Sequence, residues 1–386
     1  MTKILFDATT LALSGFHKGG VYRYGMEILQ RMPALAPADW DWGLYFNFSS
    51  GRHLEKMHET VRESGISSHK LTRLPVSWLR RFQVPSDSRL LGGKHDLFHG
   101  PCDILPPSRK AARVLTIHDL AYLRAPEGLP KEWVADHEAT VPISCRRAHQ
   151  IIAVSEFSKT DIVNAFDIDP DRIQVVYHGI SEGLHPPTDP EADRAHLAKR
   201  YGIDREFILY LGTLQPNKNI EGLCEAFQIM RGRGYSGQLV LAGAKGWIFD
   251  EMWARIVARG HDQDVLLTGF VDTEDIPLLY GNCSAFALVS FLEGFGIPVI
   301  EAMACGAPVV AANACSLIEV AGPAGLLVDP HDGESIAAGL ERTTQPGPER
   351  GELIRAGLEW AATFTWEKTA AQHVRAYRLA LESTAS

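Results

Sequence analysis

Short apolar runs alternate along the whole chain with longer segments whose apolar residues have helical spacing. Runs such as residues 207–211 and 285–289 are apolar throughout, which is typical of parallel strands buried on both faces of a sheet. The alternation predicts an α/β protein built from doubly wound parallel sheets. Strand candidates lie at residues 3–7, 43–48, 96–99, 114–118, 151–154 and 174–177 in the first half, and at 207–211, 238–242, 265–268, 285–289, 308–311 and 325–328 in the second.

A linker is expected between these halves, because the stretch from Ser181 to Pro190 is rich in proline and glycine. The chain has 386 residues, which is more than one core usually spans. We therefore predict an N-terminal Rossmann-like domain at residues 1–183 and a C-terminal one at residues 184–364. Residues 365–386 predict a final helix. Its apolar face holds Ala370, Val374, Tyr377 and Leu381.

The composition is that of an ordinary globular protein, with 45% hydrophobic and 22% charged residues. The formal net charge of -9 argues against a general nucleic-acid-binding protein, which needs a basic face. The six cysteines are scattered without a C-x-x-C motif, which favours reduced thiols and no zinc site. The start of the chain lacks a signal-peptide pattern, and no apolar run reaches the roughly 20 residues that span a bilayer, so we expect a cytoplasmic protein.

The stretch most informative about function follows the apolar run 285–289. Gly294 and Gly296 enclose Phe295 in a tight loop, and Pro298 suits the first turn of a helix. A strand, a glycine-rich loop and a helix N-terminus together direct free backbone N–H groups and a positive dipole end at one point. Such a point suits a phosphate group or a sugar oxygen.

Two carboxylates flank this loop. Glu293 precedes the helix and Glu301 lies one turn inside it, so each can reach a different part of one ligand. Carboxylates accept hydrogen bonds from hydroxyl groups, which favours a polyhydroxylated ligand. The alternative is that Glu293 is a solvated loop residue and Glu301 a surface position of the helix.

This stretch resembles the Glu-x7-Glu stretch of the retaining glycosyltransferases of family 4. The resemblance covers the two glutamates, the Gly-Phe-Gly between them and the Glu-Ala-Met-Ala-Cys-Gly-Ala-Pro-Val-Val that begins at the second glutamate. The resemblance implies the GT-B fold, in which two Rossmann-like domains face each other across a cleft and a C-terminal helix crosses back to the N-terminal domain. It also implies that Glu293 faces the donor sugar, that Glu301 binds the ribose hydroxyls, and that the backbone around Phe270 and Val271 meets the nucleotide base.

A glycine-containing loop near the start of the chain precedes an amphipathic helix, which is an arrangement that can hold a phosphate. Its alternative interpretation is a flexible turn. The loop resembles the Gly-Gly-x-x-Arg-Tyr loop of family 4, whose backbone approaches the donor diphosphate and shapes the acceptor side. The matching positions are Gly19 and Gly20.

Two histidines end predicted strands, at the edge of the sheet where open α/β proteins bind ligands. His118 matches the family position beside the donor sugar, so the resemblance implies an active-site residue; the alternative is a core or capping histidine. His99 is a candidate for the acceptor pocket, with a structural role equally open. Ser155, after the strand at 151–154, is expected first as a helix N-cap.

The segment from Gly212 to Asn219 resembles the donor-phosphate loop of the family, and Lys218 is placed to put its ammonium group on a diphosphate. Many members carry an arginine in this loop, where this chain has Thr213 and Asn217. We include Thr213 among the donor-binding residues. Lys245 offers a second cation near the phosphates.

Several Asp-x-Asp triplets occur, at Asp39/Asp41, Asp167/Asp169/Asp171 and Asp262/Asp264. We interpret them as turn residues and expect neither an essential metal nor a cofactor.

The segment from Lys70 to Lys94 is basic and contains aromatic residues. It is either a solvated loop or a membrane-surface patch that would suit a lipid-linked acceptor.

The sequence thus predicts a metal-independent retaining glycosyltransferase with His118, Glu293 and Lys218 in its active site. Closure of the two domains would limit hydrolysis of the donor. GDP-mannose is the expected donor, a saccharide or lipid-linked saccharide the acceptor, and bacterial surface polysaccharide synthesis the process. The alternatives are another donor sugar (rhamnose, glucose or galactose), a nucleotide-sugar 2-epimerase, or an inactive nucleotide-sugar-binding protein.

Overall fold

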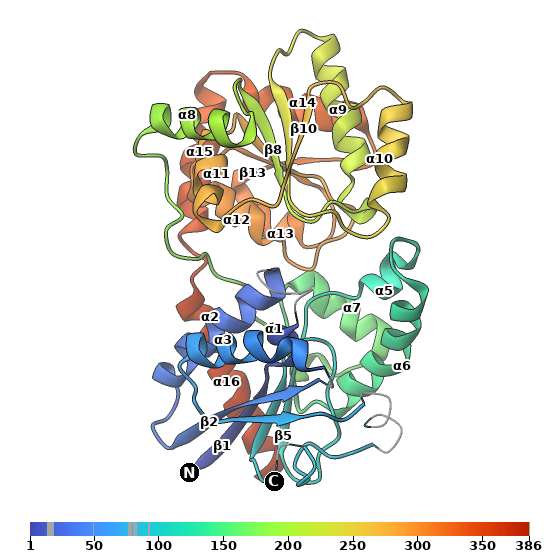
Figure 1. The fold of residues 1–386 in the computed structure, drawn as a ribbon, viewed down its shortest axis with the longest axis vertical. Helices are drawn as coiled ribbons and strands as arrows, with labels where there is room; N and C mark the ends of the chain where they lie inside the picture. Colours follow the sequence, from blue (N-terminus) through green and yellow to red (C-terminus); the bar gives the residue numbers. More distant parts are fainter. Residues whose placement is uncertain (14–18, 49, 76–78, 80–82, 92, 386) are drawn as a thin grey trace. The chain divides into compact units, whose positions relative to one another are not determined.

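The computed structural model describes residues 1–13, 19–48, 50–75, 79, 83–91 and 93–385. The chain forms two compact units (Figure 1). The first unit contains residues 1–120, 132–179 and 366–386, and the second contains residues 121–131 and 180–365. Each unit is a parallel sheet with helices on its faces.

The first unit has a seven-stranded parallel sheet in the order β3-β2-β1-β4-β5-β6-β7. The predicted strands are present within a few residues of their expected bounds, but one strand was missed. Strand β3 lies at the sheet edge, and its sequence His-Lys-Leu-Thr has one apolar residue, so patterning could not find it. The strands are β1 (Thr2–Asp7), β2 (Trp40–Asn47), β3 (His69–Thr72), β4 (Leu97–Gly100), β5 (Ala112–Ile117), β6 (Gln150–Ala153) and β7 (Ile173–Val175).

The described helices of the first unit include two that come from opposite ends of the chain and pack together, α2 and α16. Helix α16 also lies against β5 and β6, and its Trp366, Ala370, Val374 and Tyr377 are buried in the core of this unit. The hydroxyl of Ser155 caps α7 by accepting a hydrogen bond from Ser158 N at 3.0 Å, as expected. The helices are α1 (Thr9–Ala12), α2 (Gly20–Leu35), α3 (Leu54–Ser64), α6 (Lys131–Arg147), α7 (Glu156–Phe166) and α16 (Trp366–Ala385).

The second unit has a six-stranded parallel sheet in the order β10-β9-β8-β11-β12-β13. Its six strands were all predicted, within one residue at each end. They are β8 (Phe207–Leu211), β9 (Gln238–Ala242), β10 (Val265–Gly269), β11 (Ala285–Leu288), β12 (Val309–Ala312) and β13 (Gly325–Val328). Strands β8, β9, β11 and β12 are almost wholly buried, which explains their uninterrupted apolar sequences.

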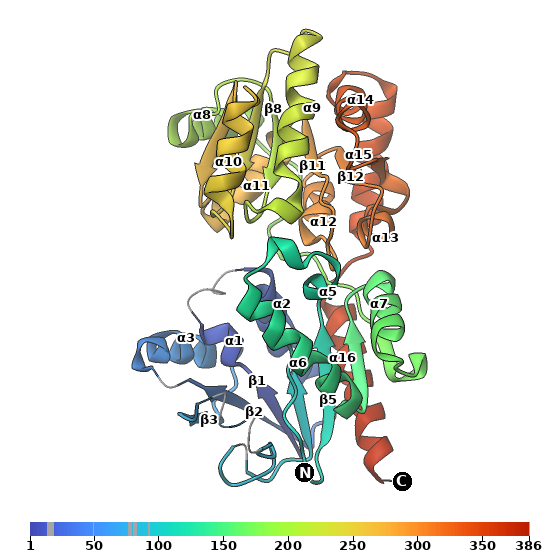
Figure 2. The same cartoon turned by 90° about the vertical axis from the view of Figure 1, so that its right-hand side faces the viewer.

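Helices cover this second sheet, with α14 packed against α9 and α15 packed against α12 (Figure 2). Helix α5 (Ala121–Arg124) belongs to the same unit although it precedes the linker in sequence. The other helices are α8 (Pro190–Tyr201), α9 (Ile220–Gly232), α10 (Phe249–Ala258), α11 (Ile276–Asn282), α12 (Ile297–Ala304), α13 (Leu317–Ala321), α14 (Gly333–Thr344) and α15 (Pro348–Ala361).

Candidate active site

Lys218 and Glu293 form an ion pair at the switch point of the second sheet, where the order of strands along the chain reverses. The central neighbours β8 and β11 diverge to opposite edges of the sheet, and such switch points bind ligands in open α/β sheets. Lys218 follows β8 and Glu293 follows β11, and Lys218 Nζ lies 2.8 Å from Glu293 Oε2. Their side chains are 19% and 12% exposed, so both charges are partly shielded from water but reachable.

Neighbouring groups fix the position of Glu293. The hydroxyl of Ser290 donates to Glu293 Oε1 at 2.8 Å, which holds the second carboxylate oxygen. The Glu293 backbone N–H donates to Cys315 Sγ at 3.2 Å, and the hydroxyl of Ser316 lies 2.8 Å from the Glu293 carbonyl oxygen. The carboxylate is therefore held at both oxygens and through its backbone, as a group that orients a ligand needs to be.

Asn219 fastens the loop of Lys218 to the loops after β11 and β13. Its Nδ2 donates to the carbonyl oxygens of Val289 at 3.0 Å and Pro330 at 2.7 Å. Its backbone has φ of 55°, in the left-handed region that asparagine tolerates better than most residues. The Phe291 N–H also donates to the Asn217 carbonyl at 3.0 Å. These bonds hold the loop that carries Lys218 against the loops after β11 and β13.

The glycine loop lies directly before α12, as predicted. Gly296 has φ of 98°, and a Cβ there would approach Leu317 Cδ2 to 2.6 Å, so only glycine fits. Gly294 and Phe295 are buried, and Pro298 is in the first turn of the helix. The backbone N–H groups at the start of α12 thus lie just after Glu293 in the chain.

Glu301 is not a surface residue, so that alternative interpretation is wrong. It is 2% exposed, and the hydroxyl of Tyr280 donates to its Oε2 at 3.1 Å. A buried carboxylate needs such partners to offset the loss of water. Its expected contact with ribose hydroxyls stays a prediction.

The other candidates in the second unit differ in exposure. Thr213 is exposed, Phe270 is 61% exposed and Val271 is buried. Lys245 is mostly exposed; its Nζ lies 3.6 Å from Asp250 Oδ1 and 4.6 Å from the centre of the Phe249 ring. The expected contact between the backbone around Phe270 and Val271 and the nucleotide base stays a prediction.

In the first unit, Gly19 caps the N-terminus of α2, and Gly20 begins that helix. Both are exposed, and a Cβ added at Gly20 would meet no atom of the described residues within 4 Å. The expected approach of these two glycines to the donor diphosphate stays a prediction. The preceding residues 15–18 of the predicted loop lie outside the described residues.

His118 follows β5 and lies among other aromatic rings. Its Nε2 is 3.0 Å from the Pro101 carbonyl oxygen, and its ring meets the edge of Tyr24 at 5.0 Å between centroids. The ring of His178 stacks alongside at 5.9 Å. Burial lowers the pKa of His118 below its ordinary value, which favours the neutral imidazole.

A buried hydrogen-bond network connects this position to α16. The hydroxyl of Tyr24 lies 2.8 Å from Thr116 Oγ1 and 2.7 Å from His373 Nε2. His99 is fully buried, with Nδ1 at 2.6 Å from the Tyr377 hydroxyl and Nε2 at 2.8 Å from Thr116 Oγ1. His99 is therefore a core residue, and the suggestion that it lines an acceptor pocket is wrong.

Sequence reasoning missed Tyr24, Thr116 and His373 as neighbours of His118. Tyr24 ends the quoted Gly-Gly-x-x-Arg-Tyr motif, which was a usable signal. For His373, the only usable signal in the sequence was its place on a helix with an apolar face. Its contact spans 349 positions of the sequence, and no local pattern encodes such a pairing.

The described residues contain no group of three or more His, Cys, Asp or Glu side chains arranged to hold a metal ion. Most members of the Asp-x-Asp triplets lie outside helices and strands, as expected, but Asp41 is part of β2.

In the basic segment, Trp78, Arg80, Arg81 and Phe82 lie outside the described residues, while the Lys70 ammonium donates to the Arg89 carbonyl at 2.9 Å.

The chain forms two Rossmann-like parallel-sheet units, and its final helix belongs to the first of them. This is the architecture of the GT-B fold. The models for "Glycosyltransferase Family 4" and "Glycosyl transferases group 1" match residues 19–183 and 193–360. The chain is 33% identical over 374 residues to O-antigen chain mannosyltransferase B of Escherichia coli, covering 93% of this chain and 96% of that protein. The chain belongs to family 4 of the glycosyltransferases.

Two further proteins resemble the chain, one in part of its sequence and one in its fold. Serotype-specific mannosyltransferase WbdA of Escherichia coli is 30% identical over 244 residues, which are 62% of this chain and 30% of that protein. The structure of sucrose-phosphate synthase from Thermosynechococcus elongatus superposes with a TM-score of 0.72 at 19% identity, over 98% of both chains.

In the described part of the protein, we find no helix with the length and apolar character needed to cross a membrane.

Proposed function

We propose that this glycosyltransferase moves a mannosyl group from GDP-mannose, with retention at the anomeric carbon, to a saccharide or lipid-linked saccharide. The process would be the synthesis of a bacterial surface polysaccharide such as lipopolysaccharide. The observation that carries the proposal is the Lys218–Glu293 pair at the switch point of the second sheet. The mannosyl group is supported by the similarity to two mannosyltransferases.

The chemistry follows from the charges at this point. Breaking the bond between sugar and diphosphate builds negative charge on the leaving group. The Lys218 ammonium and the backbone N–H groups at the start of α12 stabilise that charge, and Glu293 orients the sugar hydroxyls. Because the protein supplies cation and dipole itself, we expect the reaction to need neither a divalent metal nor a cofactor.

The place of action is part of the same proposal. We expect the protein in the cytoplasm, with the basic segment 70–94 as a peripheral contact to the membrane that carries a lipid-linked acceptor. Lys70 and Arg89 belong to the described part of that segment and bond to each other through the Arg89 backbone.

A donor panel tests the proposal. The protein is incubated with GDP-mannose, UDP-glucose, UDP-galactose or dTDP-rhamnose, with and without a mannoside acceptor, and release of nucleoside diphosphate is measured. Release from GDP-mannose only with acceptor supports the proposal. Another donor would correct the sugar, an epimerised donor without acceptor would indicate a 2-epimerase, and donor binding without turnover would indicate a binding protein. Activity that EDTA removes and manganese restores would contradict the metal-free mechanism.

A further inference from the structure

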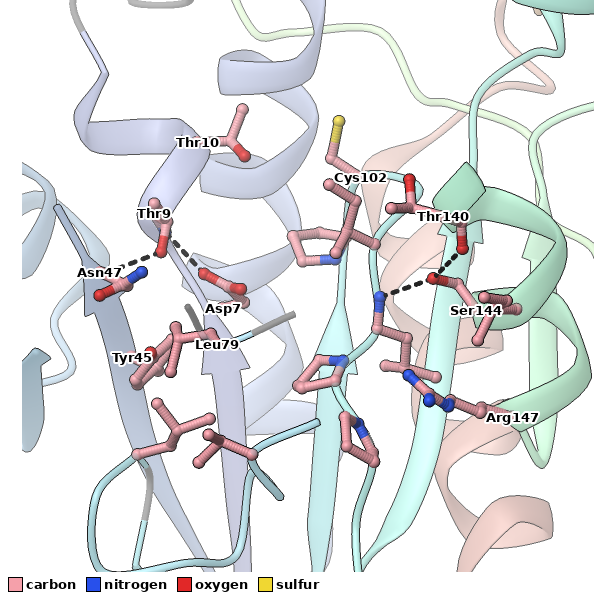
Figure 3. Close-up of a pocket in the computed structure, with 18 of the residues that line it drawn as sticks. Asp7, Thr9, Thr10, Tyr45, Asn47, Leu79, Cys102, Thr140, Ser144 and Arg147 are labelled. Atoms are coloured by element: carbon pink, nitrogen blue, oxygen red, sulfur yellow. Dashed lines mark hydrogen bonds between the residues drawn. The ribbon is translucent and has the colours of Figure 1, made fainter. Parts of the chain in front are cut away.

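Each unit contains a cavity, and the proposed reaction uses only one of them. The cavity of the first unit has about 510 Å³ and lies outside the carboxyl ends of β1, β2 and β4, with Asp7 and Arg147 in its walls (Figure 3). Open α/β sheets bind ligands at this edge, so the acceptor of the proposed reaction is expected there. The cavity of the second unit has about 300 Å³, and none of its lining residues belongs to the predicted donor site. The proposed reaction thus assigns no ligand to it.

Four segments of the second unit line this smaller cavity, which we call the α9–α14 cavity. It lies where the starts of α9 and α14, two helices that pack together, meet loops at the carboxyl edge of the sheet. The lining residues are Pro216 and Asn219 after β8, Glu221, Gly222 and Glu225 of α9, Arg259 at the end of α10, Phe291 after β11, and Pro330, His331 and Gly333 after β13.

An aromatic pair lines the α9–α14 cavity. The rings of Phe291 and His331 are stacked, with 4.8 Å between their centroids and 22° between their planes. Phe291 is 40% exposed, and Pro216 and Pro330 add further hydrocarbon surface. Flat hydrocarbon surface of this kind suits the apolar C–H face of a sugar ring.

Two carboxylates line the same cavity but differ in their partners. Glu221 is neutralised, because Arg255 Nη2 lies 2.6 Å from its Oε1 and Arg259 Nη1 lies 3.6 Å from its Oε2. Glu225 is exposed and forms no ion pair or hydrogen bond with another described residue. Its carboxylate lies over the start of α14, where a Cβ at Gly333 would be 3.3 Å from Glu225 Cδ. Glu225 can therefore accept hydrogen bonds from hydroxyl groups of a ligand.

The charges of the lining residues argue against other kinds of ligand. An anion would meet the Glu225 carboxylate, and the lining arginine, Arg259, already faces Glu221. A divalent cation would have to displace two arginines from Glu221. A hydrocarbon would take the Glu225 carboxylate out of water without giving it a hydrogen bond. A neutral ligand with apolar faces and hydroxyl groups remains, and a saccharide has both.

We infer that the α9–α14 cavity binds a neutral saccharide, with a sugar ring against the aromatic pair and sugar hydroxyl groups on Glu225. The inference rests on the proposed function for the identity of this saccharide, which is then the mannose-containing chain that the protein extends. The cavity shares its loops with the donor site, because Asn219 follows Lys218 and the Phe291 N–H donates to the Asn217 carbonyl at 3.0 Å. A chain bound here contacts the loops that carry Lys218 and Glu293.

Photoaffinity labelling tests the site directly. The protein is irradiated with mannotetraose that carries a diazirine group at its reducing end, with no donor present, and labelled peptides are identified by mass spectrometry. Labels within residues 216–225 or 330–333 that excess unlabelled mannotetraose removes support the inference. Labelling that spares both segments overturns it.

A variant of the exposed carboxylate sharpens this test. At subsaturating probe, Glu225→Ala should reduce labelling of the two segments at least about tenfold, because a charged hydrogen-bond acceptor is lost. The matched control is Glu352→Ala, which replaces an exposed glutamate on α15 of the same unit that does not line the cavity. Equal labelling in Glu225→Ala and the wild type would also overturn the inference.

The outcome is separate from that of the donor panel, because labelling needs no turnover. A protein that transfers no sugar in the donor panel but is labelled at residues 216–225 or 330–333 would refute the proposed function and keep the saccharide site. An active mannosyltransferase without these labels would keep the proposed function and refute the saccharide site.

Discussion

The polar groups of the two units differ in charge and in exposure. In the second unit, Lys218 and Glu293 form an ion pair that keeps some contact with water. In the first, the rings of His99 and His373 and the hydroxyl of Tyr24 form a network sealed inside the core. A shielded but reachable ion pair can exchange partners with a ligand at low cost, whereas a sealed network fixes geometry and resists any change of charge.

The largest expected difference between the units is their response to acid. Burial holds the pKa values of His99 and His178 well below the ordinary value and that of His373 at about 4. The unfolded chain takes up these protons near pH 6.5, so their contribution to stability is complete above that pH and is lost as the pH falls towards their folded pKa values. For His373, with a folded pKa of about 4, the loss of stability between pH 7.5 and pH 5 is about 2 kcal/mol, and His99 and His178 add to it in the same direction.

Urea unfolding at pH 7.5 and pH 5, with each unit followed by pulse-labelling hydrogen exchange, measures this loss. The second unit is the internal control, because its described histidines, such as His196 and His331, are not buried. An equal loss of stability in both units would contradict the comparison.

The next effect concerns activity. Lys218→Ala and Glu293→Ala should each lower kcat/KM by about 100- to 1000-fold, because each removes a group that acts on developing charge or on sugar orientation. Steady-state kinetics with the preferred donor measure the loss. Lys199→Ala, an exposed lysine on α8 of the same unit, is the matched control. Folded variants of Lys218 and Glu293 with wild-type rates would show that the ion pair is structural.

Asp7→Asn should stabilise the first unit at high pH. The folded pKa of about 6 lies above the unfolded value of 3.8, so the ionised carboxyl destabilises the fold above pH 6 and the difference vanishes below about pH 4. The gain is at most about 3 kcal/mol at pH 8. Urea unfolding at pH 4 and pH 8 measures it.

Asp87→Asn provides a control of opposite sign in the same unit. Burial acts to raise the pKa of Asp87, but hydrogen bonds from Arg109 N, Lys110 N and the Ser108 hydroxyl outweigh it and hold the pKa below its ordinary value. This replacement should destabilise the protein at neutral pH. If Asp7→Asn and Asp87→Asn both changed the free energy of unfolding in the same direction, the pKa directions given for these two carboxyls would be refuted.

The smallest effect is expected from Tyr24→Phe, which removes one hydroxyl from the sealed network. It leaves His373 Nε2 and Thr116 Oγ1 with one partner fewer inside the core, at a cost of about 1–3 kcal/mol. Tyr22→Phe is the control on the same helix, because the Tyr22 hydroxyl donates to Glu63 at an exposed position. Equal unfolding free energies for the two variants would mean that the network adds no stability.

The sequence predicted the sheets well because buried parallel strands are apolar throughout, and the missed β3 is the exception that lacks this pattern. The resemblance to family 4 also predicted that Lys218 and Glu293 belong to one site, and the structure places both after strands that meet at a switch point. The partners of these groups could not be predicted. Apolar spacing shows that a helix face is buried, but not that Tyr280 will meet Glu301 or that Tyr24 will meet His373.

The position of α16 in the first unit has a consequence for synthesis on the ribosome. Trp366, Tyr377 and the other core residues of α16 complete a core whose remaining members have all been translated by residue 179. At ordinary elongation rates the nascent first unit waits roughly 10–40 s for this helix, with the apolar surface that the helix will cover still open. The second unit, by contrast, has all of its residues before α16 emerges, so it can fold while its predecessor in the chain is incomplete.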